Sequence, residues 1–82
     1  MVKLKIKDAM STKILNLCDE KNITVNKLSS ISCLTQSTVQ NIVQCNSNNP
    51  KILTVVRICD GLGISLKEFF DDDLFINIDR ED

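Results

Sequence analysis

The sequence predicts an all-α protein, a compact domain of five short helices. Apolar residues recur at helical spacing in five segments, and clusters of turn-forming residues separate those segments. The stretch 2–7, VKLKIK, alternates like a β-strand, but a lone strand would have no partner. The 82 residues, 43% of them hydrophobic, are enough for one domain with one modest core.

The first helix is expected over residues 8–21, where four apolar residues share one stripe. Asp8 or Ser11 could cap its start. Asn22 is a suitable stop, because Asn tolerates the left-handed backbone conformation.

Two further helices are expected to follow, separated by a three-residue turn. Thr24 has the position of an N-cap for a short helix over 25–31, and Thr35 has the same position for a helix over 36–44. The turn between them is 32–34, Ser-Cys-Leu. Two short helices at this separation have the spacing of a helix-turn-helix.

A loop separates this pair from the fourth helix. Residues 44–50 hold three Asn, a Ser and the only Pro, a composition that is typical of loops. The fourth helix is expected over 52–62, with Gly61 and Gly63 ending it. A fifth helix begins at Leu66 behind a Ser65 cap and is expected to end between 70 and 72, with Phe69 and Phe70 closing the core.

Charge divides the chain unevenly. Residues 1–70 carry nine Lys and Arg against five acidic residues, a balance of +4, whereas 71–82 carry one Arg against six acidic residues, a balance of −5. We therefore expect a basic N-terminal arm over 1–7, a helix-turn-helix domain over 8–72 and an acidic tail over 73–82. The three Lys of the arm could follow a nucleic-acid backbone or simply be solvated.

The tail also holds four apolar residues, too many for a plain solvated segment. Two interpretations stay open: these residues fold back on their own domain, or they form the contact of a homodimer. They are Leu74, Phe75, Ile76 and Ile78.

Several classes of function are not supported. The chain has no His, no Gly-rich phosphate loop and no nucleophile–base pair, so we do not expect an enzyme. Its four Cys lack CxxC spacing and are expected to be free thiols, several of them in the core, with no metal or other cofactor. The sequence does not show whether any of these thiols responds to oxidants, and Cys45, in the loop near the third helix, is the one to examine. No apolar run approaches the ~20 residues of a membrane span, so we expect a cytoplasmic protein.

The third predicted helix has an unusual polar face. Gln36, Ser37, Gln40 and Asn41 share one side of it, and no residue of 34–43 is charged. Amide and hydroxyl groups combine donors and acceptors, as the reading of base edges requires.

The three segments NITVNKLSSIS, CLTQSTVQNIV and NNPKILTVVRICDGLGISLKEFF resemble, in order and spacing, the Cro/lambda-repressor-like (XRE) family of DNA-binding regulators. The resemblance covers residues 14–70. It implies a compact five-helix domain whose third helix enters the major groove. By position, it assigns base reading to Gln36, Ser37, Gln40 and Asn41.

The resemblance also implies phosphate contacts at the start of the second and third helices and in the loop after the third. Thr38 could instead touch a thymine methyl, and the Asn-rich loop could be no more than a turn. Backbone amides at the start of the second and fourth helices would add to these contacts. The residues are Thr24, Asn26, Lys27, Thr35, Thr38, Asn46, Ser47, Asn48 and Lys51.

The chain departs from the family pattern in three ways, at four positions. Val25 replaces a Gln that reaches a phosphate, and Cys33 replaces a Gly in the turn, where a left-handed backbone would cost about 1 kcal/mol. Cys18 and Val43 replace an Arg and a Glu that form a buried ion pair in the family. Loss of both partners together is tolerated far better than loss of one.

We therefore expect a sequence-specific transcriptional regulator, a repressor that binds an inverted-repeat operator in double-stranded DNA as a homodimer. The alternative is a protein-interaction module, or an antitoxin-like partner of another protein, with weak DNA binding. The near-neutral net charge of −1 and the Val25 substitution favour that alternative slightly.

Overall fold

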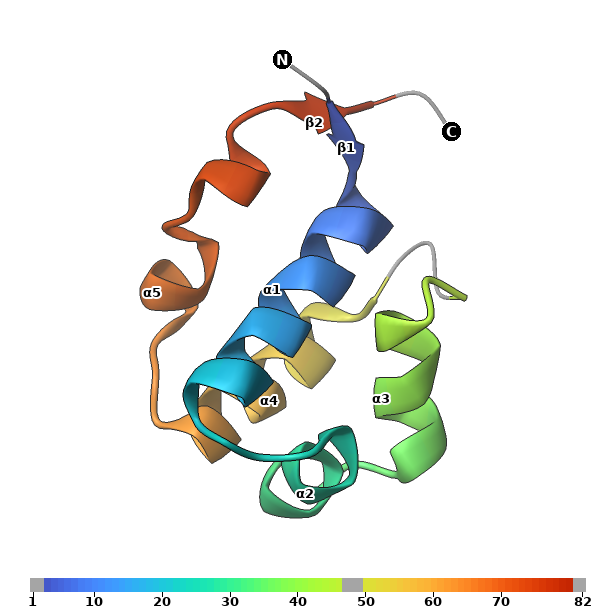
Figure 1. The fold of residues 1–82 in the computed structure, drawn as a ribbon, viewed down its shortest axis with the longest axis vertical. Coiled ribbons are helices and arrows are strands. Elements are labelled where there is room, and N and C mark those ends of the chain that lie inside the picture. The colour runs from blue at the N-terminus through green and yellow to red at the C-terminus, as the bar shows by residue number, and fades with distance from the viewer. Residues whose placement is uncertain (1–2, 47–49, 81–82) are drawn as a thin grey trace.

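Five α-helices follow one another along the described part of the chain, residues 3–46 and 50–80 of the computed structural model (Figure 1). Their bounds lie within two residues of the expected ones, so the predicted fold class is confirmed. The helices are α1 (Ile6–Glu20), α2 (Val25–Ile31), α3 (Gln36–Val43), α4 (Ile52–Leu62) and α5 (Leu66–Phe70).

Two short strands near opposite ends of the described chain pair with each other. β1 (Leu4–Lys5) runs parallel to β2 (Ile78–Asp79), with Leu4 opposite Ile78 (Figure 1). The prediction of a partnerless arm over 1–7 is therefore wrong for its described residues. The partner strand lies at the other end of the sequence, and no local pattern in VKLKIK indicates it.

α1 begins at Ile6, directly after β1 and earlier than predicted. Lys5 occupies the N-cap position without a side-chain capping bond, so the expected caps at Asp8 and Ser11 are wrong. Asp8 lies in the first turn, where the helix dipole favours a carboxylate. Ser11 is buried and bonds to α3 instead.

The predicted caps of three other helices are confirmed. Thr24 and Thr35 each accept a hydrogen bond from the amide three residues ahead, at 3.0 and 3.2 Å. Ser65 accepts one from the Glu68 amide at 3.0 Å, and the Glu68 carboxylate accepts one from the Ser65 amide. These bonds satisfy amides that would otherwise lack partners at the helix starts.

The first four helices end alike, each with one left-handed residue. The amide of that residue donates to the carbonyl three residues earlier, and the next amide donates to the carbonyl five earlier, a Schellman arrangement. The predicted stops at Asn22 and Gly63 are confirmed. The left-handed residues are Asn22, Cys33, Cys45 and Gly63, with φ of 55°, 56°, 60° and 72°.

Gly61 does not end α4, contrary to prediction. It lies inside the helix, where a Cβ would come within 2.7 Å of the Ser32 Oγ and 2.9 Å of the Ile31 carbonyl oxygen. Gly61 therefore lets α4 approach the end of α2 more closely than any other residue would allow.

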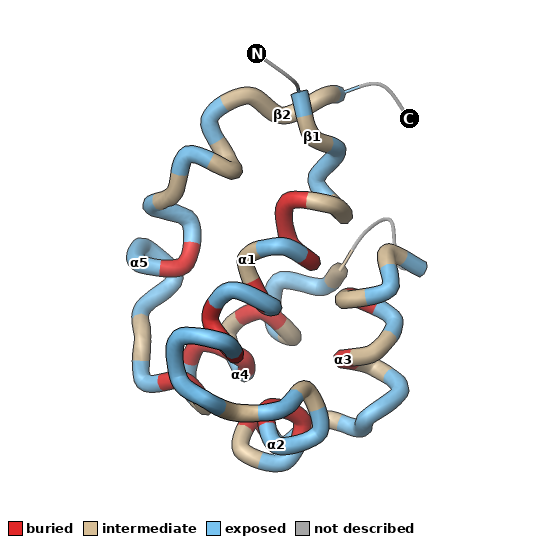
Figure 2. Tube along the Cα trace, viewed as in Figure 1, coloured by how far each residue is buried: buried red, intermediate tan, exposed pale blue. Residues whose placement is uncertain are grey.

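All five helices contribute to one core (Figure 2). Phe69 is fully buried and closes the core, as predicted, whereas Phe70 is 36% exposed. The Phe69 ring centroid lies 5.0 Å from that of Phe70 and 6.0 Å from that of Phe75. Cys18 and Cys59 are buried and behave as the small core hydrophobes that were predicted.

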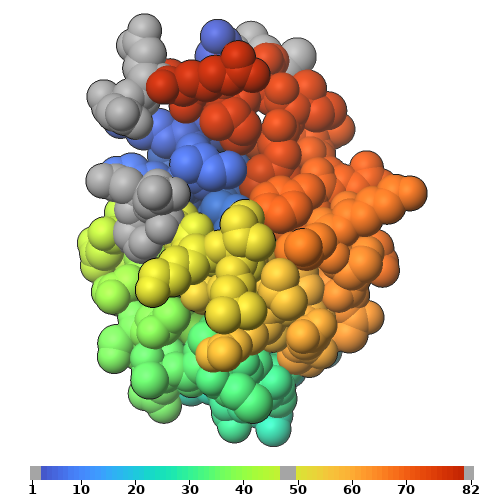
Figure 3. Space-filling model, turned by 180° about the vertical axis from the view of Figure 1, so that it is seen from behind, coloured from blue at the N-terminus to red at the C-terminus, as the bar shows by residue number. Residues whose placement is uncertain are grey.

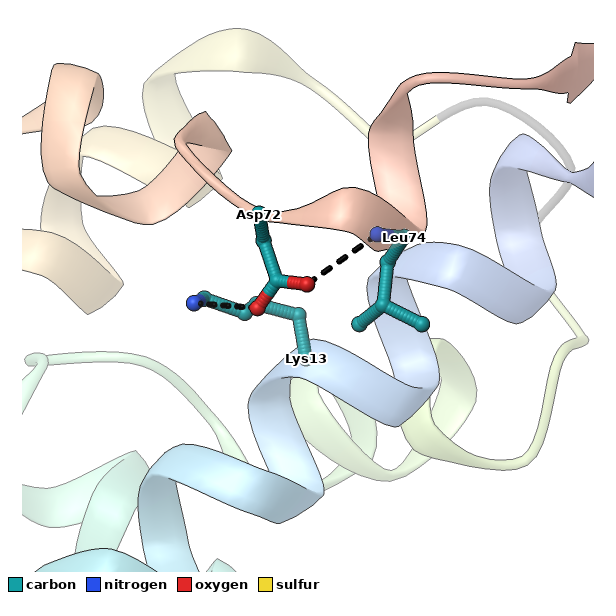
Figure 4. Close-up of polar contacts among 3 residues, drawn as sticks. All are labelled: Lys13, Asp72 and Leu74. Atoms are coloured by element: carbon teal, nitrogen blue, oxygen red, sulfur yellow. Dashed lines mark hydrogen bonds and ion pairs between the residues drawn. The ribbon is translucent and has the colours of Figure 1, made fainter.

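The segment after α5 folds back along α1. A short 3-10 helix, η1 (Asp73–Phe75), packs against α1, and β2 follows it. Asp72 joins η1 to α1. Its carboxylate lies 2.9 Å from the ammonium of Lys13, on α1, and accepts a bond from the amide of Leu74, in η1, at 3.0 Å (Figure 4). Residues 73–80 therefore pack on the domain, which is the first of the two interpretations of the predicted acidic tail.

Most of the apolar tail residues pack on their own domain, as one of the two interpretations expected. Phe75 packs against the core, and Leu74 and Ile78 are half-buried. Ile76 stays 72% exposed. Of the expected dimer contact, Ile76 is thus the residue whose side chain remains mostly available.

Candidate nucleic-acid interface

α2, a short turn and α3 form the predicted helix-turn-helix at one end of the molecule (Figure 1). The two helices pack against each other and against the rest of the domain. Leu34, in the turn, packs against the core. Cys33 beside it has a left-handed backbone, the conformation for which the family's Gly is suited. α3 buries Val39 and Ile42, so its opposite side faces solvent (Figure 2).

The four residues expected to read bases lie on that outer side of α3. Gln36, Ser37 and Asn41 are exposed, and Gln40 is half-buried. Among the described residues, no hydrogen bond engages the side chains of Gln36, Ser37 or Asn41. Their donors and acceptors are therefore free for another molecule.

Gln40 belongs to a row of three amides. Its Oε1 accepts a bond from the Gln44 Nε2 at 3.2 Å, and the Gln44 Oε1 accepts one from the Asn46 Nδ2 at 3.3 Å. Gln44 was not among the residues predicted to contact DNA. The four-residue spacing between Gln40 and Gln44 is the signal that would have placed both on one helix face.

The threonines expected at phosphates already have structural partners. Thr24 and Thr35 cap their helices, and the Thr35 Oγ1 lies 2.8 Å from the Thr38 Oγ1. Thr24 and Thr35 remain exposed, and Thr38 is half-buried. A phosphate would therefore share these hydroxyls with the helix caps.

Positive charge flanks α3 without nearby acids in the sequence. From Thr24 to Lys51 the chain has two Lys and no acidic residue. Lys27 and Lys51 are both exposed, as are Asn26 and Asn46. The expected contacts Ser47 and Asn48 lie outside the described residues.

The starts of α2 and α4 differ as anion sites. Thr24 already occupies the Lys27 amide of α2. Lys51 occupies the N-cap position of α4 without a side-chain hydrogen bond, so the Lys51 side chain does not compete for the first amides of α4. The acidic C-terminal segment lies at the opposite end of the molecule from α2 (Figures 1 and 3), away from this surface.

The departures from the family pattern have packing roles. Val25 is half-buried and packs against the core, so the lost polar contact is replaced by an apolar one. Cys18 lies in the core and Val43 packs against it. Both ends of the family's ion pair thus became part of the apolar interior, which avoids an unpaired buried charge.

Cys45 is half-buried, and its thiol is hydrogen-bonded. Its thiol donates to the Asp8 carboxylate at 3.2 Å, and burial, followed by that hydrogen bond, raises the pKa of the Cys45 thiol. A raised pKa disfavours the thiolate, which is the reactive form. Cys33 is the exposed thiol.

Neither a metal site nor a membrane span is found in the part of the chain that the structure describes. No three His, Cys, Asp or Glu residues lie together in an arrangement that could hold a metal ion there. No helix there is both long and apolar enough to cross a bilayer.

Comparison with known proteins agrees with this geometry. Residues 13–73 match the model of the Cro/C1-type HTH DNA-binding domain. The crystal structure of the prophage Lp1 protein 11 is similar to this chain, with 29% sequence identity and a TM-score of 0.80 over 92% of this chain and 99% of that one. No curated protein matches the sequence. The match spans α2, α3 and all but the ends of the described fold, so the chain belongs to the family of Cro/C1-type helix-turn-helix DNA-binding domains.

Proposed function

We propose that this domain is a sequence-specific transcriptional repressor that reads the major groove of DNA with α3 and acts as a homodimer. One observation carries the proposal: α3 presents an exposed face of amides and hydroxyls without a single charge. A face that only needs to be solvated usually carries Lys and Glu, whereas base reading needs paired donors and acceptors.

The side chains of α3 favour particular bases. Gln36 and Asn41 can each bond to adenine N6 and N7 at once, and Ser37 can donate or accept. α3 has no Arg or Lys, the side chains that most often read guanine. We therefore expect half-sites in which α3 contacts mainly A·T base pairs.

Lys27 and Lys51 would hold the phosphates on either side of the groove. Both are exposed, and each lies where a helix begins, at the first turn of α2 and just before α4. Contacts by Thr24, Asn26 and Asn46 would add to theirs without sequence preference. Two Lys are few for a DNA-binding surface, so affinity should depend strongly on base contacts and on a second copy.

The homodimer part of the proposal follows from the small size of the reading unit. One short helix contacts few base pairs, and two copies on inverted half-sites double the sequence that is read. A repressor would act by occupying its operator. Such a protein works where the DNA is, in the cytoplasm.

Alanine substitution tests the base-reading residues. Gln36→Ala and Gln40→Ala should each cost roughly 1–3 kcal/mol of operator binding and relax specificity at one base pair. Asn16→Ala, an exposed amide on α1, is the matched control and should leave binding unchanged. Unchanged operator selectivity in both Gln variants would overturn the assignment of these residues.

A second candidate function is the binding of a protein partner. Two neighbouring apolar side chains at the start of α4, Ile52 and Leu53, are 65% and 59% exposed, which favours a protein contact near the DNA-facing side. Co-purification with a partner at fixed stoichiometry, together with no DNA binding even at low salt, would favour this function over DNA reading.

A further inference from the structure

The C-terminal end of α3 is held by α1 as well as by its own turn. The carbonyls of residues 40, 41 and 42 accept bonds from backbone amides of residues 44–46. The last carbonyl of the helix, that of Val43, accepts a bond from the Ser11 Oγ at 2.6 Å, and no backbone amide of the described residues bonds to it. Ser11 thereby gives a partner to a helix-end carbonyl that the amides of residues 44–46 do not bond to.

A second contact joins the same two elements. The Cys45 thiol, directly after α3, donates to the Asp8 carboxylate at 3.2 Å and lies 3.8 Å from the Lys7 carbonyl oxygen. Asp8 and Ser11 both belong to the first two turns of α1. Ser11 is only 6% exposed, so water competes little for its bond.

The other end of α3 is held separately. Thr35 caps the helix start, and the turn that precedes Thr35 is fixed by the core packing of Leu34. α3 has eight residues and spans about 12 Å. Loss of the contacts at its C-terminal end would let that end shift while the N-terminal end stays in place.

We propose that Ser11 is a positioning residue that, with Cys45 as a second anchor, sets the tilt of α3 and so the base specificity of Gln40 and Asn41. This inference rests on the proposed function. Gln36 and Ser37 lie in the first turn of α3, next to the Thr35 cap, and do not depend on this anchor. Base hydrogen bonds require distances near 3 Å, so even a small shift of the second turn weakens discrimination there.

The test uses the full 82-residue chain and an operator selected with the wild-type protein. Affinity is measured for every single-base-pair variant of that operator, and Gln36→Ala, Gln40→Ala and Asn41→Ala assign base pairs to residues. Ser11→Ala should then lower discrimination about 2- to 30-fold at the base pairs assigned to Gln40 and Asn41. Discrimination at the Gln36 base pair should stay as in the wild type.

A matched control and a second pair of variants separate positioning from loss of stability. Ser29→Ala removes a buried hydroxyl whose bond, to the Val25 carbonyl, stays within α2, and should leave the discrimination profile unchanged. Cys45→Ala removes the second anchor and should act like Ser11→Ala, whereas Cys45→Ser keeps a donor for Asp8 and should resemble the wild type. All variants are compared at a temperature at which circular dichroism shows them folded.

Each outcome points one way. A loss confined to the second-turn base pairs in Ser11→Ala, or in Cys45→Ala if Ser11→Ala does not fold, supports the inference. If these variants lose discrimination equally at all base pairs, or lose no discrimination, the inference is overturned. The proposed function stands in that case, because the wild-type protein still prefers particular bases. A wild-type protein without any base preference would overturn the proposed function, and this inference with it.

Discussion

The Lys13 ammonium lies 2.9 Å from the Asp72 carboxylate, and this ion pair joins the middle of α1 to the segment that returns along it (Figure 4). The two side chains are 13% and 30% exposed, so solvent screens the pair only in part. The hydrogen bond from the Leu74 amide, followed by the contact with Lys13, holds the pKa of Asp72 below its ordinary value of 3.8. The pair thus contributes to stability only while Asp72 is ionised.

Asp72 should make stability depend on pH in the acid range. Because its pKa is lower in the folded protein than in the unfolded chain, its contribution is fully present above about pH 5 and is lost as the pH falls further. Asp72→Asn should lower the free energy of unfolding at pH 7 and make its decline between pH 5 and 3 less steep. Urea unfolding at several pH values measures both effects.

Asp71→Asn is the control for this experiment, because Asp71 is an exposed neighbour of Asp72 with no described bond to α1. In a double-mutant cycle with Lys13→Met, the coupling between Lys13 and Asp72 should be about 0.5–1 kcal/mol at pH 7. Equal slopes below pH 5 for Asp72→Asn and the wild type would contradict the assignment.

Cys33→Gly should stabilise the protein. The Cys33 backbone has φ 56° and its side chain is exposed, so its Cβ costs strain and gains little packing. Relief of about 1 kcal/mol of strain is offset in part by the greater entropy of Gly in the unfolded chain. Thermal unfolding should show a higher midpoint for Cys33→Gly and no gain for Cys33→Ala, which keeps the Cβ. A gain of equal size in both variants would locate the effect in the thiol instead.

Gly61→Ala should destabilise the protein despite the better helix propensity of Ala. The new Cβ would meet the Ser32 Oγ at 2.7 Å and the Ile31 carbonyl at 2.9 Å. Overpacking of this kind costs about 1–3 kcal/mol, against a gain of up to about 1 kcal/mol from propensity. The free energy of unfolding in urea measures the balance.

Ser32→Ala sharpens that prediction. The Ser32 hydroxyl is buried and has no hydrogen-bond partner among the described residues, so its removal alone should be neutral or stabilising. In the double variant, Ser32→Ala should relieve only part of the Gly61→Ala cost, because the Ile31 carbonyl remains. If Ser32→Ala restored the full stability lost in Gly61→Ala, the Ile31 carbonyl of α2 would have to move away from the new Cβ at little cost, contrary to this expectation.

Phe75→Ala and Ile76→Ala test whether the C-terminal segment is part of the domain. The Phe75 ring centroid lies 5.0 Å from that of Phe70 and Phe75 packs on the core, whereas Ile76 is 72% exposed. Phe75→Ala should cost about 2–3 kcal/mol, less than a fully buried Phe, and Ile76→Ala almost nothing. Similar small effects from both would contradict the packing of this segment on its own core.

The five helices could be predicted because their signals are local. Thr24, Thr35 and Ser65 each stand one residue before the start of a helix, and Asn22 and Gly63 mark two of the ends. Hydrophobic spacing and capping act within a few residues, so a single sequence contains them.

The remaining features depend on contacts between distant parts of the chain. The pairing of β1 with β2 and the Lys13–Asp72 bond join opposite ends of the sequence. Gly61 looked like a helix stop because its contact with Ser32 is invisible in sequence. Tertiary packing decided these features, and local propensity gave no information about them.

The same division holds for the candidate site. The polar face of α3 follows from helical periodicity alone, and the structure places Gln36, Ser37 and Asn41 on its exposed side. Ser11 looked like a helix cap, and its bond to the Val43 carbonyl emerged only from the packing of α1 on α3. The roles of these residues toward DNA stay predictions.

Selection from a random library of duplex DNA at about 50 mM salt, where phosphate contacts support binding, tests the central claim most directly. We expect an enriched motif of two inverted half-sites about 10 base pairs apart, centre to centre, with A·T pairs at the positions that α3 reads. A single half-site would contradict the homodimer while keeping the reading of bases. Absence of any enriched motif, with the protein shown to be folded, would contradict sequence-specific DNA binding.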